Sequence, residues 1–373
     1  MIMKALVTSD LERFERNIGA LLQYPARAAA IFVAIAAAVA LGLTVLNLPV
    51  GLVAVAAAVA VGSLLFARTK VLLIAFFVVA LAIVPFVVRD QYWLRVTVNI
   101  GIYAILALGL NVIVGFTGVL DLGFIAFYGI GAYTAALLML KCGWSFWAAL
   151  PVATAAGALL GVLRGLPTLR LSGDYLAIVT LGFGEIVRMA FTNWVGLTNG
   201  PMGLRGIEAP SIGAFSFGFD AARGGYMRYY FLVLILLAVA VYVVYRLRRS
   251  RPGRALLAIR DNETAAAAMG VHLSRYKTLA YALGAAFGGA AGAFFVSFNL
   301  FVSPNSFVFF ESAIVLCMVV VGGMGSIPGA IIGAVILASF PELLRFLADF
   351  RYLIFGALMV AVAVFRPRGL MRT

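Results

Sequence analysis

The chain has very few of the residues on which most metal proteins and disulfide-linked domains depend. Its 373 residues include two cysteines, Cys142 and Cys317, and one histidine, His272. A disulfide framework needs more cysteines than this, and a zinc site needs Cys and His ligands at close spacing. The sequence therefore predicts inert cysteines, no metal site and no cofactor.

Sequence motifs for catalysis and for nucleotide hydrolysis are also missing. HExxH, GxSxG and P-loop patterns do not occur, and His272 has no cluster of Cys, Asp or Glu beside it. We therefore expect that the chain is not an enzyme. Because it has no P-loop, any ATP-driven step has to come from a partner protein.

Charged residues are scarce, whereas apolar residues dominate. Only 11% of the residues are charged and 64% are hydrophobic, and the mean hydropathy is +1.10. These values exclude an ordinary soluble domain and predict an all-α polytopic membrane protein. The net charge of +14 would favour a nucleic-acid partner in a soluble chain. Here the basic residues follow the ends of apolar runs, where they indicate topology or contact with anionic lipid.

Apolar runs long enough to cross a bilayer recur along the chain, since a span needs about 20 apolar residues. Pro341 and Glu342 interrupt one late run and the last run is short, so at least one of them is expected to be re-entrant. We therefore expect about 10 to 12 transmembrane or re-entrant helices. The candidate segments are 28–46, 50–66, 71–88, 96–115, 119–140, 146–163, 175–192, 229–245, 278–298, 308–325, 327–345 and 352–365.

The basic loops predict which side of the membrane each segment faces. If every segment crosses, these loops and the C-terminal tail fall on one side, so both termini are expected to be cytoplasmic. The expected parts are a cytoplasmic segment 1–27, accessory spans 28–88, a core 96–365 with an outer loop 193–227 and a cytoplasmic loop 246–277, and a cytoplasmic tail 366–373.

Glycines at regular spacing indicate close helix packing. Gly284, Gly288 and Gly292 recur every fourth residue, which places them on one face of the segment 278–298. Lipid gives apolar helices no reason to associate, so close backbone contact between small residues has to hold them together. Packing is the first interpretation of this stripe.

Ionisable residues at membrane depth are candidates for function, because each costs about 2.5–3.5 kcal/mol on insertion scales. Glu185 and Arg188 are three residues apart and are expected to pair on one helix face, either as a structural ion pair or in the substrate path. Asp121 and Glu311 are expected near helix starts, where the helix dipole stabilises a carboxylate. Capping is therefore preferred to ion coupling for both.

The most concentrated charge lies in the segment 246–277, between two apolar runs. Pro252 and Gly253 are expected to end the preceding span, residues 254–269 to form one short amphipathic helix on the cytoplasmic face, and Gly270 to stop it. Its basic residues are Arg246, Arg248, Arg249, Arg251, Arg254, Arg260, Arg275 and Lys277.

This loop also carries a family resemblance. Residues 253–263, GRALLAIRDNE, resemble the cytoplasmic loop of LivM-type permease subunits of branched-chain amino acid ABC transporters. The resemblance covers roughly residues 96–370 in family order, whereas 28–88 match only as an apolar N-terminal extension. The other matching motifs are GLN at 109–111, GFTG at 115–118, GIGAY at 129–133, SPNSF at 303–307, VVGGMGS at 320–326 and FGALMV at 355–360.

The resemblance implies an ABC importer permease bundle in a bacterial inner membrane. It implies transport of leucine, isoleucine and valine by alternating access, driven by ATP hydrolysis on separate subunits. The implied partners are a LivH-like permease, two ABC ATPase subunits and a periplasmic amino-acid-binding protein. A permease for urea or another small amide or amino acid stays open as an alternative, as does an ion-coupled secondary transporter.

The resemblance further implies roles for individual residues. The helix over 254–270 would fit a groove on an ATPase, with Arg254, Arg260, Asp261 and Glu263 as contacts and Gly270 as the helix stop.

Three polar residues of the matched region are candidates for the translocation path. Asn111, Thr117 and Tyr133 are polar enough to line it, and each could equally form hydrogen bonds between helices.

Overall fold

A computed structural model describes residues 90–168, 173–212, 215–217, 225–343 and Gly356. The chain divides into two compact units, residues 1–94 and 95–373. The described helices belong to the second unit, apart from the first turn of α5. The expected segments 1–27, 28–88 and 366–373 lie outside the described residues, and so does the expected span 352–365 except for Gly356.

The described part of the chain is mostly helical. Seven helical segments in it are long and apolar enough to cross a membrane, and Ile327–Glu342 is a shorter apolar helix. The π-helix η1 (Asn111–Gly115) continues α5 directly, and the 3-10 helix η4 (Pro304–Phe307) precedes α14. The helices are α5 (Gln91–Leu110), α6 (Ile125–Cys142), α7 (Phe146–Thr168), α8 (Asp174–Asn193), α10 (Gly225–Arg249), α13 (Leu273–Asn299), α14 (Phe309–Gly322) and α15 (Ile327–Leu343).

These helices match eight of the expected apolar segments, with two differences in detail. The segment expected at 119–140 begins only at Ile125, because residues 118–124 form an irregular loop before α6. Pro341 does not interrupt α15, since it lies in the last turn of that helix. Apolar composition thus located the spans, but the loop 118–124 is apolar enough to resemble the start of a helix.

Helix α13 lies at the centre of the bundle and packs against α6 and α7. An all-alanine cluster of Ala135, Ala149, Ala153 and Ala293 joins the three helices and keeps their backbones close. The most apolar stretch of Gln91–Gly115, which comprises α5 and η1, is 83% buried inside the protein. The corresponding stretch of α8 is 17% buried. The core therefore surrounds α5 and α13, and α8 lies at the periphery of the second unit.

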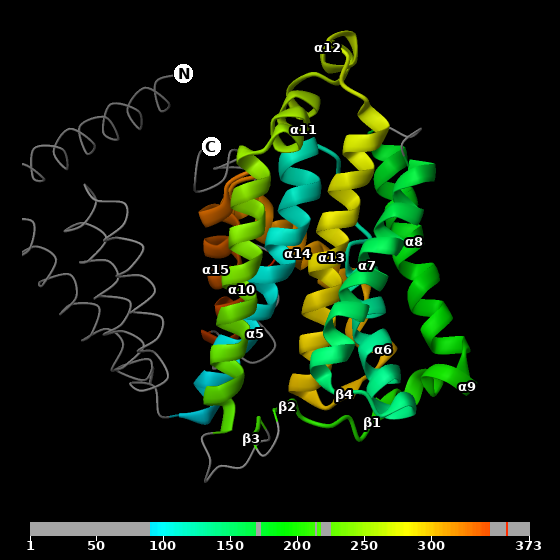
Figure 1. The fold of residues 1–373 in the computed structure, drawn as a ribbon, viewed down its shortest axis with the longest axis vertical. Helices are drawn as coiled ribbons and strands as arrows, with labels where there is room; N and C mark the ends of the chain where they lie inside the picture. The colour runs from blue at the N-terminus through cyan, green and yellow to red at the C-terminus, as the bar shows by residue number, and fades with distance from the viewer. Residues whose placement is uncertain (1–89, 169–172, 213–214, 218–224, 344–355, 357–373) are drawn as a thin grey trace, which may run out of the picture. The chain divides into compact units, whose positions relative to one another are not determined.

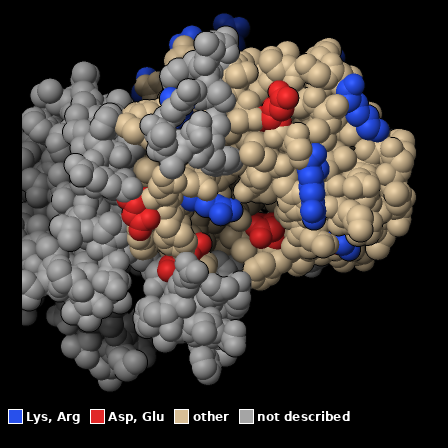
Figure 2. Space-filling view, turned by 90° about the horizontal axis from the view of Figure 1, so that it is seen from below, with Lys and Arg blue, Asp and Glu red and all other residues tan. Residues whose placement is uncertain are grey.

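Short elements occupy the two ends of the bundle. Figure 1 shows α11 and α12 at one end, here called the α12 end, and α9 with the short strands at the other, the strand end. From the strand end the surface is mostly uncharged, with separate acidic and basic side chains (Figure 2). The short elements are α9 (Val195–Thr198), η2 (Gly200–Met202), β1 (Leu204–Arg205) paired antiparallel with β4 (Phe301–Val302), β2 (Ser211–Ile212) paired with β3 (Phe215–Ser216), α11 (Arg251–Asp261) and α12 (Glu263–Ala268).

Candidate functional site

Helix α11 starts directly after the long helix α10 and lies across its end. The Ser250 side chain caps it by accepting a hydrogen bond from the backbone N–H of Gly253 at 3.2 Å. Pro252 stands in the first turn, where a missing N–H costs nothing. Leu256 and Ile259, 0% and 3% exposed, face the bundle and fix the helix on it.

The segment expected to be cytoplasmic forms two helices, α11 and α12, so the expectation of one helix over 254–269 was wrong. Asn262 adopts an extended conformation with φ −159° and ψ 108°, and its Oδ1 accepts the N–H of Ala265 at 2.9 Å. An asparagine side chain that bonds the backbone in this way favours a helix start over a helix interior. Beyond α12, Gly270 has a φ of +82°, a left-handed conformation that ends a helix.

Helix α12 projects from the bundle at the α12 end (Figure 1). Ala266 is its one buried residue, and Met269, directly after it, is 84% exposed. Lys277 of α13 donates to Glu263 Oε1 at 2.6 Å, with the two side chains 9% and 51% exposed. This ion pair fixes the start of α12 to the bundle and leaves the rest of the helix accessible.

The charged residues expected to contact an ATPase point in different directions. Arg254 and Asp261 are exposed, and Arg254 Nη1 donates to the carbonyl oxygen of Arg249 at 3.1 Å. Arg260 points into the bundle instead, where its Nη1 donates to the carbonyl oxygens of Gly115 at 2.8 Å and Met324 at 3.5 Å. Only part of the expected set therefore lies on the exposed surface.

Asn111 is fully buried and joins η1 to the turn between α14 and α15. Its Oδ1 accepts the N–H of Gly325 at 2.7 Å, and its Nδ2 donates to the carbonyl oxygen of Ser326 at 3.2 Å. The amide thus bonds two segments that lie far apart in the sequence.

Thr117 and Tyr133, the other two residues expected to line the translocation path, differ in whether their hydroxyl groups form hydrogen bonds. Thr117 bonds locally, since its Oγ1 donates to the Ile113 carbonyl oxygen at 2.5 Å. Tyr133 stacks on Phe191 with ring centroids 4.1 Å apart and is 2% exposed. Its hydroxyl is buried without a hydrogen-bond partner in the described part of the chain.

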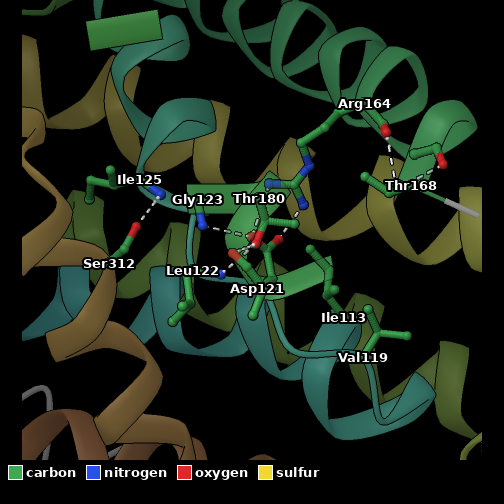
Figure 3. A network of polar contacts seen from close by, with 12 residues as sticks. Ile113, Val119, Asp121, Leu122, Gly123, Ile125, Arg164, Thr168, Thr180 and Ser312 are labelled. Carbon is green, nitrogen blue, oxygen red and sulfur yellow. Dashed lines mark hydrogen bonds and ion pairs between the residues drawn. The ribbon is translucent and has the colours of Figure 1, made fainter. Parts of the chain in front are cut away.

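A buried ion pair joins the loop 118–124 to α7 (Figure 3). Asp121, 0% exposed, pairs with Arg164, 3% exposed. Asp121 Oδ1 accepts from Arg164 Nη1 at 2.9 Å and from the N–H of Gly123 at 3.0 Å, and Oδ2 pairs with Nη2. The expectation that Asp121 caps a helix was wrong, because α6 begins four residues later. Sequence reasoning missed this pair of Asp121 with Arg164.

Aromatic rings and hydroxyl groups complete this network. The Arg164 guanidinium lies 4.5 Å from the ring centroid of Phe127 and 4.9 Å from that of Tyr281. Thr180 of α8 accepts the N–H of Leu122 at 3.1 Å. Ser312 of α14 similarly accepts the N–H of Ile125 at 3.0 Å (Figure 3). Side chains from two helices, α8 and α14, thus satisfy backbone N–H groups of the loop and of the first turn of α6.

Glu185 and Arg188 pair on α8 as expected, with Arg188 Nε donating to Glu185 Oε2 at 2.8 Å. Their side chains are 31% and 27% exposed, near the middle of the span Tyr175–Asn193. Glu311 lies in the first turn of α14 and accepts a hydrogen bond from the Tyr103 hydroxyl at 2.8 Å. All four side chains of these two pairs are partly buried.

The expected glycine stripe of α13 faces neighbouring backbones. A Cβ on Gly284 would lie 2.7 Å from the Gly109 carbonyl oxygen, and one on Gly288 would lie 3.0 Å from Phe127 Cβ. A Cβ on Gly292 would collide with the Tyr128 carbonyl oxygen. No group of three His, Cys, Asp or Glu residues suited to a metal occurs within the described ranges.

Comparison with known proteins gives one consistent result. The family model described as "Branched-chain amino acid transport system / permease component" matches residues 92–363. The chain is 43% identical over 325 residues to the Escherichia coli K12 "High-affinity branched-chain amino acid transport system permease protein LivM", covering 82% of this chain and 75% of that relative. It is 27% identical over 292 residues to LivH of the same strain, covering 72% and 91% of the two chains. No solved structure gives a significant match.

Proposed function

This chain belongs to the family of branched-chain amino acid transport permease components, and from that premise we propose that it is the LivM-like permease subunit of an ATP-driven importer. Its substrates are leucine, isoleucine and valine, and it moves them by alternating access across the bacterial inner membrane. It acts with a LivH-like permease, two ABC ATPase subunits and a periplasmic amino-acid-binding protein. ATP hydrolysis takes place on the ATPase subunits.

The projecting pair of helices α11 and α12 is the observation that carries this proposal. A chain without a P-loop needs a surface through which a separate ATPase can move the membrane bundle. The segment α11–α12 suits this task because α11 is packed onto the bundle through Leu256 and Ile259 while α12 and Met269 are exposed. Orientation follows from this assignment, with the α12 end and both termini in the cytoplasm.

The ATPase contacts are the exposed charges of this segment. Arg254 and Asp261 on α11 and Glu263 at the start of α12 provide charges of both signs. Met269 adds an apolar contact of the kind that seats a helix in a groove. Gly270 ends the segment and turns the chain back toward α13.

The peripheral helix α8 is the surface that faces the partner permease and the path between the two subunits. A half-exposed ion pair in the middle of a span is costly in contact with lipid, so Glu185 and Arg188 require cover from protein or water. Tyr133 of α6 stacks on Phe191 of α8, and its buried hydroxyl has no hydrogen-bond partner among the described residues. Tyr133 is therefore the remaining candidate for the translocation path.

Reconstitution of the complex in proteoliposomes tests the function. The four kinds of subunit, with ATP inside the vesicles, are expected to take up leucine, isoleucine and valine. Omission of the ATPases is expected to stop this uptake. Preferred uptake of urea or a small amide would change the substrate. Uptake that persists without ATPases and follows an imposed ion gradient would contradict the importer assignment.

A further inference from the structure

Three segments that are distant in the sequence meet around the guanidinium of Arg260. They are α11, the end of η1 and the turn 323–326 between α14 and α15. Asn111 closes the group by bonding η1 to the same turn through Gly325 and Ser326. We call this group the Arg260 junction.

The backbone of η1 leaves its last carbonyl group free for the arginine. After Gly115 the next N–H groups bond to other acceptors: that of Phe116 bonds Ile113, and that of Gly118 bonds Val114. The N–H of Val119, which would bond Gly115 if the helix continued, lies 3.4 Å from Thr117 Oγ1. Helix ends leave such carbonyl groups unsatisfied, and π-helical turns are frequent at functional positions. Arg260 therefore donates to the Gly115 carbonyl oxygen, which the helix backbone leaves without a partner.

The absence of a side chain at Gly325 leaves room for the Arg260 guanidinium. Gly325 has a φ of +83°, and a Cβ there would lie 2.5 Å from Arg260 Nη1 and 3.1 Å from the Gly115 carbonyl oxygen. Gly118, with a φ of +74°, lies beside the same side chain, with a built Cβ 3.5 Å from Arg260 Cγ. The site would close if Gly325 carried even a methyl group.

We propose that Arg260 is the positioning residue that transmits motion of α11 to the ends of α5 and α14, and that it is not an ATPase contact. This inference rests on the proposed function, since it specifies how the coupling segment acts on the bundle. Leu256 and Ile259 make α11 move as one body with the bundle surface beneath it. Arg260 then connects that body to two helix ends at once, so that η1 and the turn 323–326 move together when the ATPases close.

The test uses the complete complex in proteoliposomes and separates binding from coupling. Three quantities are measured: the ATPase that copurifies with the permease, basal ATP hydrolysis, and leucine molecules transported per ATP hydrolysed. Arg260→Gln is expected to keep ATPase copurification and basal hydrolysis within twofold of the wild type and to lower leucine per ATP at least tenfold. Arg260→Lys keeps one donor to a carbonyl oxygen and is expected to recover part of that loss. Arg205→Gln, at an exposed arginine of β1 outside the α11–α12 segment, is the matched control.

Gly325→Ala approaches the junction from the membrane domain and keeps the arginine. Its added methyl group is expected to displace the guanidinium and to reproduce the loss of leucine per ATP, so it decides the question if Arg260→Gln fails to fold. Gly143→Ala controls for the left-handed backbone alone, because Gly143 has a φ of +62° and open space around its Cβ position.

The results separate this inference from the proposed function. Loss of ATPase copurification in Arg260→Gln would make the residue an ATPase contact and overturn the inference while leaving the importer assignment intact. Wild-type leucine per ATP in both Arg260→Gln and Gly325→Ala would overturn it as well. Failure of the wild-type complex to couple uptake to ATP would contradict the proposed function itself, and the inference with it.

Discussion

The buried ion pair between Asp121 and Arg164 gives the most quantitative prediction. Removal of one partner leaves an uncompensated charge in a site where the two residues are 0% and 3% exposed. We therefore compare Asp121→Leu, Arg164→Met and the double variant, whose apolar side chains preserve much of the volume. Asp121→Asn is the matched control for charge, because it retains an acceptor for the N–H of Gly123.

The magnitudes follow from the surroundings of the pair. Breaking a buried pair from one side costs about 3–5 kcal/mol. For Asp121→Leu we expect about 3 kcal/mol, at the lower end, because Phe127 and Tyr281 still face the guanidinium and each contributes about 0.5–2 kcal/mol. For Arg164→Met we expect about 4 kcal/mol, since no aromatic face stabilises a carboxylate. The double variant is expected to lose about 1–3 kcal/mol, the cost of leaving the Gly123 N–H unpaired.

Unfolding by sodium dodecyl sulfate in mixed micelles measures these losses. Tryptophan fluorescence follows tertiary structure, since the chain has four tryptophans, and far-ultraviolet circular dichroism follows the helices. The single losses of about 3 and about 4 kcal/mol and the double loss of about 1–3 kcal/mol give an expected coupling energy of about 4–6 kcal/mol between the two sites. Additivity of the single losses within about 0.5 kcal/mol would refute the pairing.

Three further predictions concern the bundle and the coupling segment. Glu185→Gln should lower the yield of folded protein in membranes more than the double replacement with Arg188→Gln, because it leaves one cation unpaired; equal yields would refute the pairing. Glu263→Gln should reduce ATPase copurification several-fold while changing stability by about 1 kcal/mol, because its side chain is 51% exposed and the glutamine amide oxygen can still accept from Lys277, which is 9% exposed; unchanged copurification would count against the contact surface. Gly284→Val should abolish folding, seen as loss of a monodisperse peak in size-exclusion chromatography, because its side chain would collide with the backbone of α5.

The spans were predictable because a bilayer imposes a length and a composition on each of them. Eight apolar segments of the sequence match described helices, and the glycine stripe of α13 lies where neighbouring backbones come close. Pairing between residues on one helix was also predictable, because helix geometry fixes which positions are neighbours. The ion pair of Glu185 and Arg188 needs only the geometry of one helix.

Contacts between distant segments were not predictable from one sequence. Arg164 lies 43 residues from Asp121, and Arg260 lies 145 residues from Gly115, so their partners depend on how the helices pack. The error of expecting a single helix over 254–269 could have been avoided, because the sequence itself marks the break. Asn262 followed by Glu263 is a typical helix start, and it marks the break between α11 and α12 that the expected single helix lacked.

The central claim is that α11 and α12 receive the ATPase, and photocrosslinking tests it most directly. Two exposed methionines offer matched positions: Met269, 84% exposed and directly after α12, and Met202, 74% exposed in η2 between α9 and β1. A photoreactive amino acid at position 269 of the assembled complex is expected to crosslink to an ATPase subunit, and the same residue at position 202 is not. An ATPase adduct at position 202 together with none at position 269 would contradict the account.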